Sequence, residues 1–164
     1  MTGPACRGRD TDMAPDEATY RQATIHDAEA IAEVINRIVQ EPNPVGLTGP
    51  ATADGVRTWL TRQGGQGGLF LCLVGGKVAG FSALDFNTQE PDTATLGVWV
   101  LPEYRRRGLG TATAEYALGF ARDKGYGRLR GRLPESNEVA LSFLSSIGAL
   151  VPLYNPEARF ELPL

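Results

Sequence analysis

The segment at residues 105–110, Arg-Arg-Arg-Gly-Leu-Gly, has the side chains and the spacing needed to bind a phosphorylated ligand. Guanidinium groups donate hydrogen bonds to phosphate oxygens, and glycines, which lack a Cβ atom, let a phosphate approach the main chain. A helix predicted to begin here would add its unpaired N–H groups and its dipole. The segment therefore predicts a pyrophosphate site, although its spacing matches neither a Walker P-loop nor a Rossmann fingerprint. The alternative is a solvated arginine run before an ordinary helix.

A strand and a helix must position this loop. Residues 94–101 alternate in the way that a strand does, and Pro102 ends the strand because proline lacks a backbone donor. Apolar residues then recur at helical spacing over residues 109–124, and Gly125 provides a C-terminal stop. The loop is therefore predicted to connect the end of a strand directly to the start of a helix.

Composition and length restrict the class of protein. The chain of 164 residues suits one domain with a genuine core, and its 42% apolar and 21% charged residues are typical of soluble globular proteins. A net charge of −3 argues against a nucleic-acid partner. Cys6, Cys72 and the single histidine, His26, predict no disulfide and no metal site. No run has transmembrane length or resembles a signal peptide, so we expect no membrane association and a cytoplasmic location.

The rest of the chain is predicted to fold around the loop. Residues 1–18 carry almost no large apolar side chain and are expected to form a flexible N-terminal tail before one domain at residues 19–164. The strands predicted at 69–74, 77–86 and 94–101 are expected to form an antiparallel meander. The other predicted strands are residues 20–23, 127–133, 149–154 and 158–162. Helices are predicted after a capping box at Thr24–Asp27, after Thr52 or Asp54, and after Ser136 or Asn137.

Two stretches resemble the GNAT N-acetyltransferase superfamily. Arg105-x-x-Gly108-x-Gly110 matches the acetyl-CoA motif of that family, Gln/Arg-x-x-Gly-x-Gly/Ala, and the preceding Val-Leu-Pro-Glu-Tyr resembles the end of its fourth strand. The helix beginning near Asn137 and ending at Gly148 is similar to a second family run. The resemblance covers nearly all of the chain from about Ala18. It implies an α/β (α+β) fold with a central mixed, mostly antiparallel sheet of about six to seven strands, flanked by about four helices.

The resemblance also implies a set of cofactor contacts. In the family, main-chain groups of the fourth strand face the pantetheine arm, the motif wraps the pyrophosphate, and the asparagine helix contacts the arm. Transferred to this chain, the implied acetyl-CoA contacts are Val98, Trp99, Val100, Arg105, Arg106, Arg107, Gly108, Leu109, Gly110, Thr111, Asn137 and Phe143. The loop at 41–51 and the following helix would help to form the acceptor pocket, with Val45, Leu47 and Trp59 as lining candidates, although core packing is the favoured role of Trp59.

The residues that would carry out proton transfer do not follow the family pattern. Leu144 stands where many members have a general-acid tyrosine, and Leu96 and Gly97 stand where carboxylates are often found. The catalytic candidates are Asp85, Glu135 and Tyr154, with Glu90 and Asp92 as further carboxylates; Glu103 is interpreted as structural. A water relay to solvent could replace a dedicated base.

The resemblance therefore implies transfer of an acetyl, or small acyl, group from acetyl-CoA to a primary amine by direct attack. The acceptor would be a small-molecule amine or a peptide N-terminus, and a homodimer stays open because the sequence does not define the oligomeric state. Two alternatives remain: a non-catalytic acyl-CoA-binding or regulatory module, and a domain whose arginine loop recognises an acidic protein.

Overall fold

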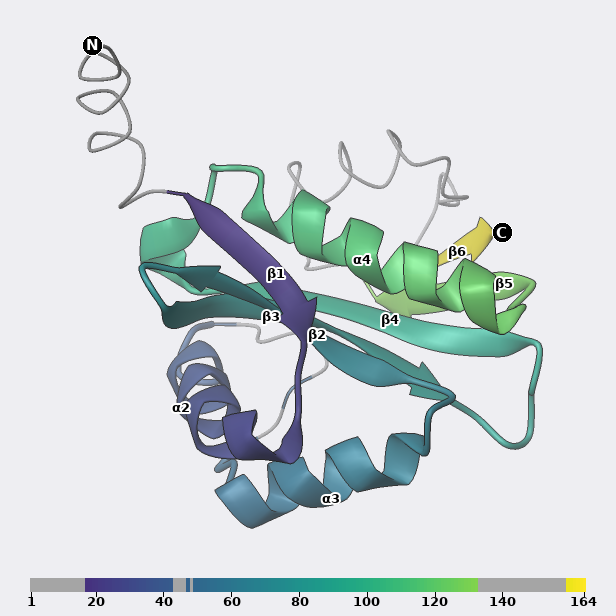
Figure 1. Cartoon of the computed structure of the whole chain (residues 1–164), viewed down its shortest axis with the longest axis horizontal. Coiled ribbons are helices and arrows are strands. Elements are labelled where there is room, and N and C mark those ends of the chain that lie inside the picture. The colour runs from purple at the N-terminus through teal and green to yellow at the C-terminus, as the bar shows by residue number, and fades with distance from the viewer. Residues whose placement is uncertain (1–16, 43–46, 48, 133–158) are drawn as a thin grey trace, which may run out of the picture.

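A six-stranded sheet with helices on both faces forms the described part of the chain in the computed structural model (Figure 1). The structure describes residues 17–42, 47, 49–132 and 159–164. The strands lie in chain order, and every neighbouring pair is antiparallel except β4 and β5, which are parallel. The strands are β1 (Ala18–Gln22), β2 (Gly68–Val74), β3 (Lys77–Phe86), β4 (Thr93–Val100), β5 (Arg128–Arg132) and β6 (Arg159–Pro163).

Helices α2 (Ala28–Ile38) and α3 (Ala53–Gln63) cover one face of the sheet, and α4 (Leu109–Lys124) covers the other (Figure 1). Each face has its own core, because strand side chains alternate between the two faces. On the α2/α3 side, Phe81 and Ala83 of β3 pack with the apolar stripe of α2. On the α4 side, Leu84 and Leu96 pack against α4. The sheet therefore separates the surroundings of α4 from those of α2 and α3.

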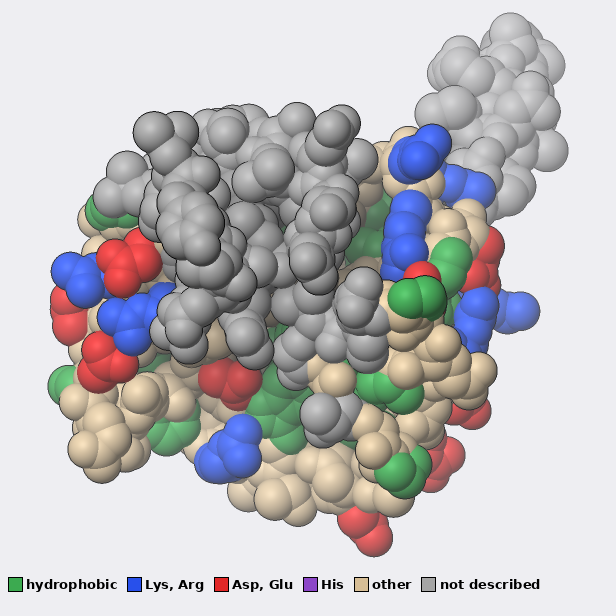
Figure 2. Space-filling view, turned by 180° about the vertical axis from the view of Figure 1, so that it is seen from behind, with side chains coloured by type: hydrophobic (Ala, Val, Ile, Leu, Met, Phe, Trp, Pro, Cys, Tyr) green, Lys and Arg blue, Asp and Glu red, His purple; other side chains and the backbone are tan. Residues whose placement is uncertain are grey.

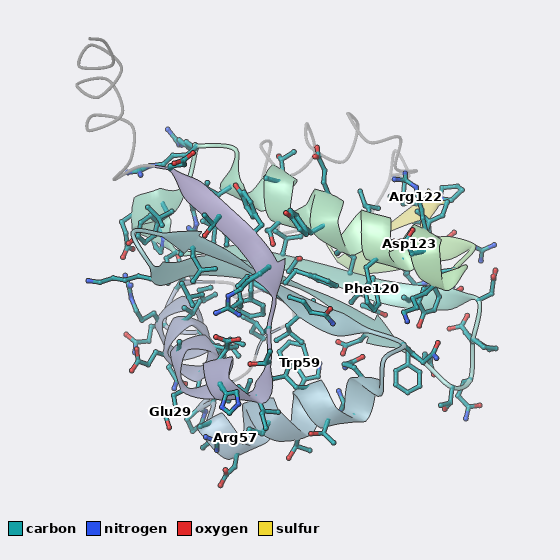
Figure 3. All side chains as sticks on the ribbon, in the orientation of Figure 1. Glu29, Arg57, Trp59, Phe120, Arg122 and Asp123 are labelled. Carbon is teal, nitrogen blue, oxygen red and sulfur yellow. The ribbon has the colours of Figure 1, made fainter. Side chains whose placement is uncertain are left out.

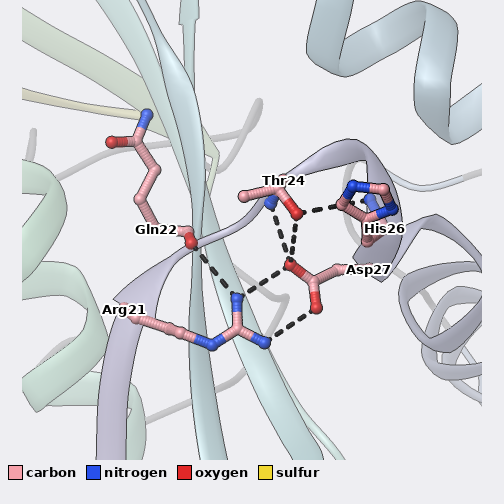
Figure 4. A network of polar contacts seen from close by, with 5 residues as sticks. All are labelled: Arg21, Gln22, Thr24, His26 and Asp27. Carbon is pink, nitrogen blue, oxygen red and sulfur yellow. Dashed lines mark hydrogen bonds and ion pairs between the residues drawn. The ribbon is translucent and has the colours of Figure 1, made fainter.

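The capping box predicted at Thr24–Asp27 is confirmed, and it closes a 3-10 turn, η2 (Ile25–Asp27), directly before α2. The Thr24 backbone N–H donates to Asp27 Oδ2 over 2.8 Å, and Arg21 donates to both carboxylate oxygens of Asp27 over 2.8 Å (Figure 4). The Arg21 hydrogen bond is the main cause that lowers the pKa of Asp27 to about 2. This network fixes the corner between β1 and α2.

Helix α4 is joined to the sheet by buried polar contacts as well as apolar ones. Thr113 Oγ1 donates to the Phe70 carbonyl over 3.0 Å, and Ser82 Oγ donates to the Thr113 carbonyl over 2.9 Å. Thr113 and Ser82 are fully buried. These hydrogen bonds hold the first half of α4 over β2 and β3, and so they fix the position of the helix start relative to the sheet.

Most predicted elements are found with small shifts at their ends. The strands predicted at 20–23 and 94–101 lie at Ala18–Gln22 and Thr93–Val100, and the antiparallel meander of β2, β3 and β4 is confirmed. The helix predicted after Ser136 or Asn137 and the strand predicted at 149–154 lie outside the described residues, as do residues 1–16 of the predicted tail. No helix in the described part of the chain is both long and apolar enough to cross a membrane.

Candidate active site

The loop between β4 and α4 turns through two residues with left-handed backbone conformations. It begins with the 3-10 turn η3 (Pro102–Tyr104), and then Arg106 has φ +67° and Gly108 has φ +76°. Gly108 is the N-cap of α4, no side chain caps this helix end, and its first turn contains no acidic residue. The first amides of a helix have no partner within the helix. The start of α4 thus presents N–H groups and the positive end of the helix dipole, and no side chain of the described residues caps it.

The structure requires glycine at one of the two glycine positions of the motif and does not require it at the other. A Cβ atom at Gly108 would meet nothing within 4 Å, but the positive φ disfavours any other residue. Gly110 has no positive φ, and a Cβ there would lie 3.5 Å from Val100 Cγ2 and 3.6 Å from Val98 Cγ1, which are ordinary contacts. Backbone conformation and packing against the described residues therefore do not require glycine at 110. A ligand that approaches the main chain closely would require it.

Arg105, the first residue of the motif, holds the loop in place. Its Nε donates to the Val100 carbonyl over 2.8 Å, and its two terminal nitrogens donate to the Glu41 carboxylate over 2.9 and 2.6 Å. It thus connects the end of β4 to the segment that follows α2. Arg107 lies over the Tyr104 ring, with 5.7 Å from the guanidinium carbon to the ring centroid. The predicted phosphate contacts of these two arginines stay predictions, and the structure adds a positioning role for Arg105.

Cationic side chains gather at this end of the molecule. Figure 2 shows Lys and Arg side chains around the region where β4 leads into α4. Arg106 and Arg107 are exposed, and Arg106 makes no ion pair with any of the described residues. The local charge is therefore positive although the whole chain carries a formal net charge of −3, and it favours an anionic ligand.

Over most of its length, the edge of β4 beside the loop has no partner strand among the described residues. β4 pairs with β3 from Ala94 to Val100, but among the described residues it pairs with β5 only at Thr93, Ala94 and Thr95. Residues 96–100 therefore have an edge with no β5 partner, roughly 17 Å long at about 3.4 Å per residue. This edge extends from the point where β4 and β5 separate, at Thr95, to the loop before α4. An extended ligand arm can pair with such an edge.

The α2/α3 face beside this edge carries an aromatic row. The Trp99 ring lies over Gly97, where a Cβ atom would clash with the indole. Trp99 contacts Phe81, with ring centroids 5.1 Å apart, and Phe81 meets the edge of Trp59 at 6.3 Å. Trp59 lies between α3 and the sheet (Figure 3). The predicted core packing of Trp59 is thus confirmed.

One catalytic candidate, Asp85, lies in a polar network on this face. Asp85 Oδ1 accepts hydrogen bonds from Trp59 Nε1 and Gln63 Nε2, both over 2.5 Å. Gln63 is buried, and its Oε1 accepts from the Phe86 N–H over 3.3 Å. Asp85 is the β3 partner of Thr95 in the β3–β4 register. Gln63 was not predicted from the sequence, although its spacing of four residues from Trp59 on an amphipathic helix places the two side chains on one face.

Three other carboxylates considered from the sequence have structural partners. Glu90 pairs with Arg130 over 3.0 Å, and Asp92 Oδ1 accepts from the Gly127 N–H over 3.1 Å. Glu103 pairs with Arg37 over 2.7 Å. Its own backbone N–H and then Arg37 keep the pKa of Glu103 below its ordinary value, as expected for the structural residue that the sequence predicted.

The remaining site predictions fall on segments without a structural description. They are two catalytic candidates, two cofactor contacts on the helix predicted after Ser136 or Asn137, and the leucine that stands in place of the family's tyrosine. These residues are Glu135, Tyr154, Asn137, Phe143 and Leu144, and they lie outside the described residues, as does Val45 of the predicted acceptor pocket. Leu47 of that pocket is buried in the core on the α2/α3 side.

Comparison with known proteins shows what kind of protein has this geometry. Residues 32–149, more than half of the chain, match the family model described as "Acetyltransferase (GNAT) family". The chain belongs to the GNAT acetyltransferase family. A protein described as an uncharacterized N-acetyltransferase of Methanocaldococcus jannaschii is 30% identical over 95 residues, which are 55% of this chain and 42% of that protein. The match thus spans less than half of that relative.

Solved structures have the same GNAT fold. A putative acetyltransferase from Salmonella typhimurium, solved with its cofactor acetyl-CoA, has a TM-score of 0.77 at 20% identity, covering 90% of this chain and 94% of that one. A phosphinothricin acetyltransferase from Sinorhizobium meliloti, in complex with acetyl-CoA, has a TM-score of 0.78 at 17% identity, covering 90% of this chain and 88% of that one. At these identities the likeness shows the fold. The mixed, mostly antiparallel sheet expected from the sequence is confirmed.

Proposed function

We propose that this GNAT protein transfers an acetyl, or small acyl, group from acetyl-CoA to a primary amine by direct attack. The observation that carries the proposal is the start of α4. No side chain in the described part of the chain caps its amides, and neither the backbone conformation of Gly110 nor its packing there requires glycine. A pyrophosphate bound there would accept hydrogen bonds from those amides. The two solved relatives described above contain acetyl-CoA, which supports the same ligand here.

The described residues fit the other parts of this ligand. The edge at residues 96–100, which has no partner strand among the described residues, leads away from the loop and offers the main-chain groups of Val98 and the N–H of Val100 to the pantetheine arm. The Val100 carbonyl already accepts from Arg105, and the main chain of Trp99 pairs with Phe81 of β3, so the predicted contact of Trp99 is not one of these main-chain bonds. Arg106 and Arg107 add positive charge beside the phosphates. An arm that follows this edge brings its thioester end toward Thr95, where β4 and β5 separate. The acceptor, a small-molecule amine or a peptide N-terminus, then approaches from the α2/α3 face.

The chemical step needs no covalent enzyme intermediate. The neutral amine forms the new C–N bond while the thioester C–S bond breaks, and the sulfur leaves as a thiolate. Holding both reactants in one site supplies the orientation that the step requires. The protein's own contribution is therefore to bind the coenzyme rigidly, to orient the amine and to remove its proton.

A charge-reversal variant in the loop tests the ligand assignment. Gly108→Asp places a carboxylate where the pyrophosphate is proposed to bind, so calorimetry with CoA should detect no binding in the micromolar range. Gly108→Asn controls for the strain of a side chain at φ +76° without adding a charge, and it should keep more affinity than Gly108→Asp. Gly119→Asp controls for a carboxylate elsewhere on α4, because a Cβ there meets none of the described residues within 4 Å. It should bind CoA as the wild type does. A folded Gly108→Asp variant with unchanged affinity would contradict the proposed site.

Leu144, in place of the family's usual tyrosine acid, favours a second candidate, a module that binds acyl-CoA without transferring the acyl group. Thiol release measured against a panel of amines separates the two. Acceleration by at least one amine supports the transferase, whereas CoA binding without any amine-dependent release supports the module. Absence of CoA binding would instead favour a domain that recognises an acidic protein.

A further inference from the structure

We propose that Asp85 binds the acceptor amine and removes its proton, and that Trp59 and Gln63 position it for this task. This inference rests on the proposed function. Asp85 pairs across the sheet with Thr95, the last residue of β4 that pairs with β5 among the described residues. Partners across antiparallel strands have Cα atoms about 4.5–5.5 Å apart. Asp85 therefore lies one strand away from the point where the proposed thioester end arrives.

The Asp85 side chain is on the face from which the amine would approach. Its hydrogen bonds to Trp59 and Gln63 of α3 place the carboxylate on the α2/α3 side of the sheet. The α4 side is filled by the second core. The coenzyme is proposed to enter along the β4 edge from the start of α4, so amine and thioester would meet from different directions near Thr95.

The network fixes one carboxylate oxygen and leaves the other available. Both N–H donors bind Oδ1, and no hydrogen bond to Oδ2 is found among the described residues. The Asp85 side chain is 34% exposed, so solvent or a ligand can reach it. Arg62 is the cation beside it, 3.9 Å from Oδ1 and itself 65% exposed. Oδ2 can thus accept a hydrogen bond from an ammonium group while Oδ1 stays bound.

Trp59 and Gln63 are suited to a positioning role because they are themselves held. Gln63 is 2% exposed, and the hydrogen bond that its Oε1 accepts from the Phe86 N–H orients its amide. The Trp59 ring packs against Phe81. Two donors on rigid elements hold the Asp85 carboxylate in one orientation before any ligand binds, which is what an efficient site requires.

Acetylation of an amine requires the removal of two protons from its nitrogen. A primary amine arrives as an ammonium ion, and its conversion to an amide releases two protons in total. Asp85 accepts the first, so that the nitrogen becomes neutral, and passes it to solvent. The nitrogen then forms the C–N bond as the C–S bond breaks, Asp85 accepts the second proton, and the departing thiolate takes up one proton from solvent.

Asp85→Asn tests the inference because asparagine keeps the oxygen that Trp59 and Gln63 need. We expect kcat/KM for the best amine to fall at least about 100-fold near neutral pH, with an unchanged affinity for CoA by calorimetry. The deficit should shrink as the pH rises, because free amine then needs no base. Trp59→Phe should lower kcat less, and Asp54→Asn, an exposed carboxylate at the start of α3, should have no effect.

A second readout does not depend on turnover. The chain has two tryptophans, so its NMR spectrum contains two indole N–H signals, and Trp59→Phe identifies the one that reports on Asp85. With CoA bound, adding an amine should shift the Trp59 signal in the wild type and leave it unmoved in Asp85→Asn.

The outcomes separate the two proposals. An Asp85→Asn variant with wild-type kcat/KM and pH profile would show that Asp85 only accepts structural hydrogen bonds, and the inference would fail while the transferase stands. If no amine accelerates thiol release in the wild type, the proposed function fails. An amine-dependent shift of the Trp59 signal would then still support amine binding at Asp85. The absence of such a shift would overturn the inference about Asp85 as well.

Discussion

Replacing Gly110 with alanine should make the protein more stable and its coenzyme binding weaker. The new methyl group would lie 3.5 Å from Val100 Cγ2 and 3.6 Å from Val98 Cγ1, so it adds contacts without a clash. Glycine in a helix is less favourable than alanine by roughly 0.5–1 kcal/mol. For a domain of this size, 1 kcal/mol raises Tm by about 2–4 °C. We therefore expect Tm of the free protein to rise by about 1–4 °C.

The affinity should change in the opposite direction. If the methyl group keeps a phosphate oxygen from the amide it would bind, the complex loses one hydrogen bond to a charged group, worth roughly 1.5–3 kcal/mol. That corresponds to an increase in Kd of roughly 10- to 150-fold. Calorimetry with CoA measures the affinity, and thermal unfolding without ligand measures the stability. Gly119→Ala, later in the same helix, should gain stability and keep its Kd.

This variant is informative because its stability and its affinity for CoA are expected to change in opposite directions. A variant that simply damaged the fold would lose both stability and affinity. If Gly110→Ala is stabilised and binds CoA as tightly as the wild type, no ligand approaches the main chain at residue 110, and the argument from an unexplained glycine is refuted.

Three further variants test the contacts that hold the loop before α4, the corner before α2, and helix α4 itself. Arg105→Ala should weaken CoA binding through loss of its bond to the strand carbonyl, and a double-mutant cycle with Glu41→Ala should give a coupling in stability of at most about 1 kcal/mol, since the pair is partly exposed. Asp27→Asn should cost roughly 2 kcal/mol in urea unfolding at pH 7. The folded pKa of Asp27 is lowered from 3.8 to about 2, so this stabilisation is present above pH 3.8 and disappears as the pH falls through 2; Asp54→Asn should show no such change. Thr113→Val should cost about 0.5–1.5 kcal/mol by the same measurement, because it removes the buried hydrogen bond to the Phe70 carbonyl.

The sequence was most informative where neighbouring residues determine the structure. The turn into α4 follows from a proline that ends a strand and from glycines that permit unusual backbone conformations. The capping box at Thr24–Asp27 is also a local pattern, and the structure contains it as predicted. In each case the interacting groups lie within a few residues of one another, so their separation in the sequence determines whether they can make contact.

Contacts between distant segments could not be predicted in this way. Arg105 binds Glu41 across 64 residues, and Asp85 is reached by Trp59 and Gln63 from another element. Alternation along β3 gives the face of Asp85, but not which helix covers that face. The point where β4 and β5 separate, at Thr95, depends on the pairing of two strands more than 30 residues apart. These tertiary contacts distinguish Asp85 from the other candidate carboxylates, because they place it beside the point where β4 and β5 separate.

The missing carboxylate of β4 and the position of Asp85 have a common physical explanation. The sequence has Gly97 where family members often carry an acidic residue, and the Trp99 indole occupies the space above Gly97 that such a side chain would need. β4 therefore cannot present a carboxylate to the α2/α3 face at that position without displacing the ring. Asp85 reaches the same face from the neighbouring strand, opposite Thr95. A base supplied by β3 is thus what the packing of this chain permits, which is why the absence of an acidic residue on β4 is not an argument against catalysis.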